Sequence, residues 1–448
     1  MRYLPHSDGE RRDMLAKIGV KSIDDLFLDV PKKVRMKKLP DLANHASEMR
    51  VEKIISDLAG KNLSAADAPF FIGAGAYHHH VPASVDHIIQ RSEFLTSYTP
   101  YQPEVSQGTL QYLFEFQSQV AMLTGMDIAN ASMYDGSTAT AEAVLMAHRL
   151  TRREKAVVSG GLHPQYTDVV RTIAQYSETE LVELAPGPQL GASIIDAIDD
   201  ETSCVVVQNP DFFGGVMELQ DIADAAHDKG ALLIVVVTEI ISLGAIKSPG
   251  DMGADIVVGE GQSLGNGLNF GGPYVGLLAT RQKFLRQMPG RVSGETVDQD
   301  GKRGYVLTLS AREQHIRREK ATSNICTNSG LCSLAFTIHL SLLGEKGLRS
   351  LAMINHGKAV ALAKSLDAIE GVDVVTKNFF NEFTIRVPGN AAQIVDQLAG
   401  EGILAGLPVS RLLPDVEEFE NLIVLAITET SSDDDIDSLC ASLKGAIS

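Results

Sequence analysis

The stretch ADIVVGEGQSLGNGLNFGGP, residues 254–273, starts as an uninterrupted apolar run and passes into a glycine-rich turn. Loops that follow the strands of an α/β sheet are where such proteins bind ligands, so polar side chains here are candidates for chemistry. Gln262 and Ser263 occupy this position. A dinucleotide fingerprint, GxGxxG, would require glycine where Leu264 stands, so NAD binding is not expected.

A second candidate is MYDGSTATAEAVLMAHR, residues 133–149, in which a glycine-containing turn opens an alanine-rich helical pattern. Free N–H groups and the helix dipole at such a start favour an anion, and Ser137 and Thr138 would add hydroxyl donors. The alternative is that Asp135 or Ser137 caps the helix through its own side chain. For this motif by itself we favour capping.

Histidines stand in two places of interest. In YHHH, residues 77–80, adjacent side chains point apart and cannot easily converge on one metal ion, and the chain has no HExxH motif. We therefore expect a surface or interface loop there and no metal site. In GLHPQYTDVV, His163 follows an expected strand end, where its ring either stacks on a cofactor or serves as a structural loop residue.

The richest polar stretch is AREQHIRREKATSNICTN, residues 311–328. Its cations fall within nine residues: Arg312, His315, Arg317, Arg318 and Lys320. Glu313 and Arg317 have the i,i+4 spacing of a self-paired, solvated helix face. The functional alternative is recognition of a carboxylate or phosphate, which arginine binds through two parallel hydrogen bonds.

The elements that must position these residues alternate between strand and helix from 155 to 280. Apolar runs predict strands at 156–159, 180–185, 203–210, 231–237, 254–259 and 271–280. Helical patterns separate the first four of these strands. Continuous apolar runs suit strands that are buried on both faces, so the alternation predicts a mostly parallel sheet covered by helices.

The remainder of the chain predicts two appendages to this sheet. Residues 1–65 read as an N-terminal helical arm, in which Ser7 and Glu10 have capping-box spacing. A helix is expected over 110–123, and Gly125 should end it. We divide the rest into a large domain, 66–330, and a small C-terminal α+β domain, 331–448.

Composition narrows the class of protein. The chain is 44% apolar and 21% charged, which is typical of a globular enzyme-sized chain, and its net charge of −18 argues against nucleic-acid binding. No run reaches the ~18 apolar residues of a transmembrane helix, and no apolar stretch follows the N-terminal positive charges of a would-be secretory signal. Four scattered cysteines predict neither structural zinc nor a disulfide framework, so we expect a cytoplasmic protein without membrane contact.

Several long strings together resemble one family. They are SYTPYQPEVSQGTLQ, MYDGSTATAEA, QNPDFFG, ISLG, ADIVVGEGQSLGNGLNFGGPYVG, MPGR and GETVDQDGKRGYVLTLSAREQHIRREKATSNICTN. The chain resembles the glycine decarboxylase (P-protein) of the glycine cleavage system over nearly its whole length. More narrowly, it is similar to the N-terminal half, which in many bacteria and archaea is a separate polypeptide, subunit 1 or alpha.

The resemblance implies a fold-type-I pyridoxal-phosphate transferase-like α/β architecture, with a central mostly parallel sheet flanked by helices and a smaller C-terminal α+β domain. It also implies a reaction. Glycine loses its carboxylate as carbon dioxide, with pyridoxal phosphate as the electron sink. The aminomethyl group then passes to the lipoyl arm of the H-protein. The T-protein and the L-protein complete the system.

The same resemblance shows what this chain lacks. In fold-type-I enzymes the Schiff-base lysine follows the strand that matches ADIVV, where the partner subunit has a histidine–lysine pair. Ser263 stands where the lysine would be, and Lys247 and Lys283 belong to other elements. The strand ALLIVVV should end in an aspartate for the pyridine nitrogen, but Glu239 is the nearest carboxylate.

We therefore expect no catalytic residue and no covalent cofactor on this chain. The resemblance implies that this chain retains a vestigial cofactor site. Its residues are Ser137, Thr138, His163, Glu239, Gln262 and Ser263. Pyridoxal phosphate is expected on subunit 2, the beta chain. Fold-type-I active sites form between chains, so the resemblance implies a heterodimer that pairs into a heterotetramer.

In such an assembly this chain would form one wall of the partner's active site. The candidates for this wall are Tyr98, Tyr101, Gln102, Arg317, Arg318, Lys320, Thr322 and Asn324. Two other hypotheses remain: a stand-alone pyridoxal-phosphate enzyme with an atypical lysine such as Lys320, and a non-catalytic scaffold that docks the H-protein or stabilises the beta chain.

Overall fold

The computed structural model describes residues 6–36, 38, 40–43, 45–188, 191–326 and 329–447. The chain divides into two units, Met1–Asn62 and Leu63–Ser448. The helices of the first unit are α1 (Asp8–Ile18), η1 (Ile23–Phe27), η2 (Lys32–Val34) and α2 (Glu48–Ala59). Helix α1 begins with the expected capping box, because Ser7 accepts from the Glu10 N–H and Glu10 accepts from the Ser7 N–H.

A seven-stranded sheet forms the centre of the second unit, in the order β1-β7-β6-β5-β4-β2-β3. Its strands are β1 (Ile128–Ala129), β2 (Lys155–Val158), β3 (Glu180–Glu183), β4 (Thr202–Gln208), β5 (Leu232–Val237), β6 (Ile256–Glu260) and β7 (Gly276–Thr280). Neighbouring strands are parallel except where β7 pairs with β6 and β1. The predicted mostly parallel sheet is therefore confirmed.

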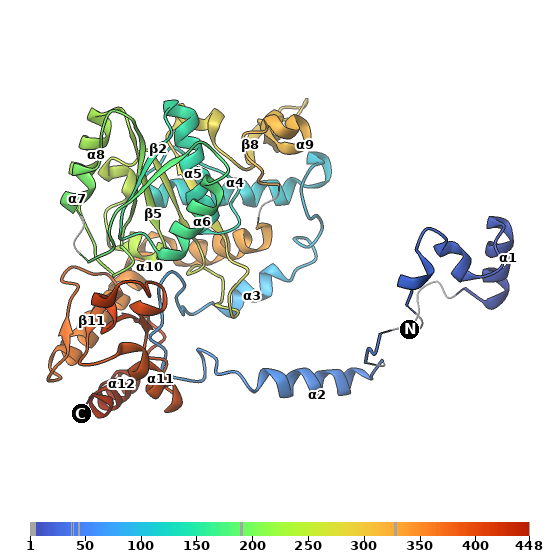
Figure 1. Ribbon diagram of the computed structural model, residues 1–448. Coiled ribbons are helices and arrows are strands. Elements are labelled where there is room, and N and C mark those ends of the chain that lie inside the picture. The colour runs from blue at the N-terminus through green and yellow to red at the C-terminus, as the bar shows by residue number, and fades with distance from the viewer. Residues whose placement is uncertain are drawn as a thin grey trace. The chain divides into compact units, whose positions relative to one another are not determined.

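Helices cover both faces of this sheet, which is why its central strands are largely apolar (Figure 1). Val206 and Val236 pack on the side of α5 (Gly136–Thr151) and α6 (Pro164–Ala174). Val205 and Val235 pack on the opposite side. The helices of that side are α4 (Gln107–Thr124), α8 (Gln220–Asp228) and α10 (Gly330–Asp367).

Turn residues end these helices largely as the sequence predicts. Gly125 follows α4 in the left-handed conformation, with φ of 68°. Gly344 interrupts the helical geometry within α10.

The other helices of this unit are α3 (Ala83–Ile89), α7 (Gly191–Asp196), α9 (Gln314–Arg317), α11 (Ala391–Gly400) and α12 (Asp433–Ala446). None of the helices within the described ranges is both long enough and apolar enough to cross a membrane.

A smaller antiparallel sheet follows α10, in the order β10-β11-β13-β12. Its strands are β10 (Asp373–Val374), β11 (Glu382–Arg386), β12 (Leu407–Pro408) and β13 (Leu422–Ala426). It packs with α11 and α12 around its own apolar core. A separate hairpin, β8 (Val292–Val297) with β9 (Arg303–Thr308), precedes α9.

One connecting segment joins the smaller sheet to the central one. Phe71 donates its N–H to Leu404 and accepts from Ala426, so the chain starts this segment beside β13. Residues 73–79 then continue to the carboxyl ends of β5 and β6. The approach is close at Gly73, where a Cβ atom would collide with Glu382 and Ala426.

Candidate functional site

The N-terminus of α5 is capped by the chain's own carboxylate. Asp135 Oδ1 accepts from the Thr138 N–H at 2.8 Å and from the Ser137 hydroxyl at 2.6 Å. Thr138 Oγ1 in turn accepts from the Asp135 N–H, which completes a capping box. The capping interpretation of this motif is confirmed, with Asp135 as the cap.

A second carboxylate, which belongs to Glu260, reaches the same helix start. It accepts from the Gly136 N–H at 3.0 Å, from the Gln262 N–H at 3.1 Å and from the Val275 N–H at 3.0 Å. Glu260 is only 2% exposed. Its burial raises the pKa of the carboxyl to about 8, although the backbone N–H groups oppose the shift.

Glu239 lies at the end of β5 and is paired with a histidine from a distant part of the chain. Its Oε2 atom lies 2.9 Å from His79 Nε2, and the other imidazole nitrogen lies 2.9 Å from Glu429 Oε2. Burial alone would lower the pKa of His79, but the two carboxylates outweigh it and raise the pKa to about 10. Two carboxylate oxygens on the two ring nitrogens indicate a protonated imidazolium.

Gln262, next to the position expected for a lysine, holds the same connecting segment. Its side chain accepts from the Tyr77 N–H at 2.8 Å and donates to the Tyr77 carbonyl at 3.0 Å. Tyr77 donates its hydroxyl to Glu382 at 2.8 Å. Ser263 is 1% exposed, and its hydroxyl has no hydrogen-bond partner in the structure.

His163 is a buried structural residue that also contacts this segment. Its Nδ1 atom accepts from the Gln165 N–H and so caps α6, which leaves the proton on Nε2 for the Ala74 carbonyl at 2.9 Å. Burial lowers the pKa of His163 to about 4, so the ring is neutral. The Ala74 carbonyl and the Gly75 backbone thus lie beside the Cδ2–Nε2 edge of the His163 ring.

The fit of pyridoxal phosphate to this site can be tested residue by residue. The cofactor needs an amine for the imine, free donors for its phosphate, a free carboxylate for its ring nitrogen and space beside a ring. Here the donors at the start of α5 already bind Asp135 and Glu260, and Glu239 binds His79. Backbone lies against His163. The residues present do not fit the cofactor.

A second, more open region contains the wall candidates. Arg291, which is 4% exposed, donates to the Tyr101 hydroxyl at 3.0 Å and to the Cys326 carbonyl. Its guanidinium lies 5.3 Å from the centre of the Tyr101 ring. The Cys326 N–H donates to the hydroxyl of Tyr134. One buried arginine thus joins the loop around Tyr101 to the segment that ends near Cys326.

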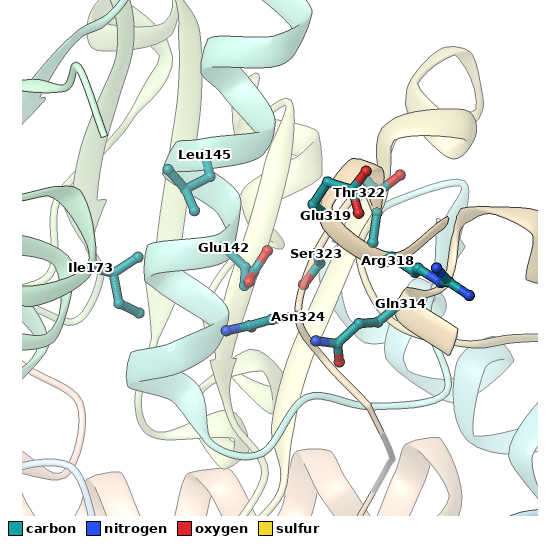
Figure 2. A pocket seen from close by; sticks show the side chains of 10 residues that line it. Glu142, Leu145, Ile173, Gln314, Arg318, Glu319, Thr322, Ser323 and Asn324 are labelled. Carbon is teal, nitrogen blue, oxygen red and sulfur yellow. The ribbon is translucent and has the colours of Figure 1, made fainter. Parts of the chain in front are cut away.

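This segment borders a pocket of about 320 Å³ against helices α5 and α6 (Figure 2). Its lining residues are Glu142, Leu145, Ile173, Gln314, Arg318, Glu319, Ala321, Thr322, Ser323 and Asn324. Glu142 is 6% exposed, its burial raises its pKa, and its Oε2 atom has no hydrogen-bond partner. Figure 2 shows the guanidinium of Arg318 directed away from Glu142.

The other wall candidates are more scattered. Tyr98 is 85% exposed and lines a different pocket of about 460 Å³, which also contains Tyr112 and Cys332. Gln102, Arg317 and Lys320 are exposed. The structure therefore gathers Arg318, Thr322 and Asn324 around one pocket, places Tyr101 against Arg291 and places Tyr98 in a different pocket.

Two expectations about this chain are wrong. The ion pairs of Glu313 are with Arg291 at 3.4 Å and His315 at 3.6 Å, because a buried guanidinium competes better than exposed Arg317. For YHHH the surface-loop alternative is wrong at His79, whose side chain is 1% exposed, while the interface alternative stays a prediction. Charge complementarity with Glu239 and Glu429 explains its burial.

Sequence reasoning also missed several residues that define these regions: His79, Arg291, Glu260, Glu382 and Glu429. Two of them could have been noticed in the amino-acid sequence. Glu260 ends an otherwise apolar strand pattern, and His79 lies in an unusual histidine run. The contacts of these residues with partners more than a hundred positions away are not visible in any local pattern.

The sheet order, the helices on both faces and the helix start beside the ends of β5 and β6 define the fold of the fold-type-I pyridoxal-phosphate transferases. A C-DES variant with glycine covalently linked to its pyridoxal phosphate has this fold, with a TM-score of 0.61. It is 15% identical, and the match covers 85% of this chain and 97% of that chain, so this likeness shows the fold alone.

The sequence pattern of the family described as glycine cleavage system P-protein matches residues 1–443. A Xanthobacter autotrophicus protein named probable glycine dehydrogenase (decarboxylating) subunit 1 is 63% identical over 99% of each chain. The crystal structure of a glycine decarboxylase (P-protein) of the glycine cleavage system, in inhibitor-bound form, is 44% identical over 100% of both chains, with a TM-score of 0.90. This chain belongs to the glycine cleavage system P-protein family.

Proposed function

We propose that this chain is subunit 1 of a glycine dehydrogenase (decarboxylating) and that it works with a separate subunit 2 in the glycine cleavage system. In this proposal subunit 2 carries pyridoxal phosphate on its Schiff-base lysine. The present chain contributes one wall of that active site. The two subunits form a heterodimer, and two heterodimers pair into a heterotetramer.

One observation carries the assignment of the cofactor to the partner: the equivalent site of this chain is occupied by its own side chains. Glu260 and Asp135 bind the donors that a phosphate would need, and His79 binds Glu239. A relative with 63% identity over 99% of each chain is named subunit 1, which supports the need for a second subunit.

The wall residues have chemistry that suits glycine. The cofactor on subunit 2 supplies the electron sink for loss of the glycine carboxylate. Tyr101 accepts a hydrogen bond from Arg291, so its own hydroxyl proton is available to a carboxylate outside this chain. Arg318 presents its guanidinium outward (Figure 2). Together they would orient glycine, or the lipoyl arm of the H-protein, and keep water out of the site.

The test is borohydride reduction followed by peptide mass spectrometry, which fixes pyridoxal phosphate to any lysine that holds it. The chain would be reduced alone and after co-expression with subunit 2. We expect a pyridoxyl-lysine on subunit 2 only. A pyridoxyl-lysine on this chain would overturn the proposal and identify the true nucleophile.

The same experiment addresses the stand-alone alternative. Lys320 is exposed, whereas an imine-forming lysine needs a site that holds the rest of the cofactor. A label on Lys320 in the chain alone would favour that alternative.

The rate of glycine turnover by the assembled complex distinguishes the scaffold alternative from the proposed wall. If the chain only docks the H-protein or stabilises subunit 2, then Tyr101→Phe and Arg318→Ala should leave the glycine turnover of the assembled complex unchanged. A loss of turnover with intact assembly would support the wall instead.

A further inference from the structure

We propose that residues 73–79, together with Glu260, form a built-in plug that takes the place of pyridoxal phosphate in this chain. The missing lysine is then only one of the reasons why the chain lacks a cofactor. Restoring a lysine at position 263 would not by itself create a cofactor site, because the volume and the binding groups are already used.

Within the plug, His79 takes the place of the pyridine ring of the cofactor. Its imidazole presents an N–H to Glu239 at 2.9 Å, as a pyridinium N–H would present itself to a carboxylate. Glu239 is 2% exposed and also binds the Asn381 side chain and the Ile241 N–H. A bound pyridine ring would have to displace an imidazolium from a dry ion pair, which is costly.

Within the plug, Glu260 takes the place of the phosphate of the cofactor. Its carboxylate accepts three backbone N–H groups, one of which is the first N–H of α5 at Gly136. Asp135 takes two further donors at the same helix start. A phosphate approaching this point would find the N–H and hydroxyl donors of the helix start already bound by Glu260 and Asp135.

The plug is anchored at both ends and in the middle. Ala74 donates its N–H to Glu382 at 2.5 Å, and Tyr77 donates its hydroxyl to the same carboxyl group. The Gln262 side chain holds the Tyr77 backbone by two hydrogen bonds. His79 also binds Glu429, which follows β13. These contacts tie the plug to the central sheet and to the smaller sheet at once.

The experiment uses three variants of the full chain assembled with subunit 2. They are Ser263→Lys alone, Ser263→Lys with His79→Ala and Glu260→Gln, and Ser263→Lys with His80→Ala. His80 is the exposed neighbour of His79, so the last variant is the matched control. Each complex is supplied with pyridoxal phosphate, reduced with borohydride and digested, and circular dichroism checks that each chain is folded.

We expect no pyridoxyl group at position 263 in the single variant or in the control, and a clear one in the variant that removes both plug side chains. The label on subunit 2 lies on a different peptide, so failure of this proposal is distinguishable from failure of the proposed function. Equal labelling of position 263 with and without the plug would overturn the proposal.

A second measurement decides the matter if a buried lysine prevents folding. Hydrogen–deuterium exchange of the unmodified chain, within the complex, reports on the amides of Ala74 and Tyr77. We expect slow exchange that added pyridoxal phosphate leaves unchanged. Fast exchange, or exchange that the cofactor alters, would show that the segment is not seated in the site and would overturn the proposal.

Discussion

The cofactor-like site and the proposed wall of this chain both contain polar residues but differ in how deeply they bury them. At the cofactor-like site, Glu239, His79 and Glu260 are almost fully buried and bind one another or nearby backbone. At the wall, Tyr98 is 85% exposed and Tyr101 is 54% exposed. Polar groups that are buried and satisfied stabilise a fold, whereas exposed ones remain available to a partner.

Under the proposed function, this difference shows how a subunit can contribute to an active site without holding the cofactor itself. The groups of the cofactor-like site are bound within the chain, whereas the exposed wall candidates are free to contact a substrate on the partner subunit. The comparison would fail if the buried groups proved unimportant for stability, or if the exposed groups proved unimportant for turnover.

The largest expected effect is on stability at the plug. His79→Ala leaves the buried carboxylate of Glu239 and the partly buried carboxylate of Glu429 without their cation, and removal of one partner from a buried pair costs about 3–5 kcal/mol. Urea unfolding would measure the loss in the free energy of unfolding. His80→Ala is the control, and a change within about 0.5 kcal/mol is expected there. Similar losses for the two variants would contradict the comparison.

The second prediction concerns pH and Glu260. The pKa of this carboxyl is raised from 4.5 to about 8, so the folded chain holds the proton more tightly than the unfolded chain does. Its contribution to stability is therefore complete below pH 4.5 and is lost as the pH rises toward 8. Asp135 and Tyr166 face the same carboxyl.

Glu260→Gln should remove this dependence, since an amide does not titrate. The free energy of unfolding of the unmodified chain should fall, relative to that of the variant, as the pH rises from 4.5 to about 8. His79 and Glu382 titrate in both proteins, so their effects largely cancel from the difference. Urea titrations at a series of pH values would check this, and parallel curves would be the contrary result.

A third prediction tests whether Arg291 organises the wall. Arg291→Ala removes the link between Tyr101 and Cys326, so both loops lose their shared anchor. We expect the kcat/KM of the assembled complex for glycine to fall by about tenfold to hundredfold, because misplaced orienting groups cost that much. The cofactor label on subunit 2 should persist. Arg349→Ala, on the exposed surface of α10, is the control, and an unchanged kcat/KM in Arg291→Ala would count against the wall.

The smallest effect is expected at Tyr98. Because this side chain is 85% exposed, Tyr98→Phe should change stability by less than about 0.5 kcal/mol. Loss of one orienting hydroxyl should lower kcat/KM for glycine by about two- to tenfold. Tyr176→Phe is a matched control, because Tyr176 is 87% exposed and lies beyond α6. Equal rates for the two variants would remove Tyr98 from the wall.

Much of the fold was accessible from local patterns. The strands from β2 to β7 overlap the predicted apolar runs, because the central strands are buried on both faces and are therefore largely apolar. The caps at Ser7 and Asp135 could also be predicted, since a cap involves residues three positions apart.

The candidate site also has a part that the sequence predicts and a part that it does not. The resemblance to the P-protein family implied that Ser263 stands where a lysine would be expected and that Glu239 is the carboxylate nearest the end of its strand, because each residue is matched through the strand that precedes it. The sequence could not show that His79 binds Glu239 across 160 positions, or that Arg291 joins Tyr101 to Cys326. Those pairings depend on how the two sheets and the connecting segment pack. Only the tertiary structure decides them, because burial strengthens a charge pair and no local pattern encodes which distant groups will be buried together.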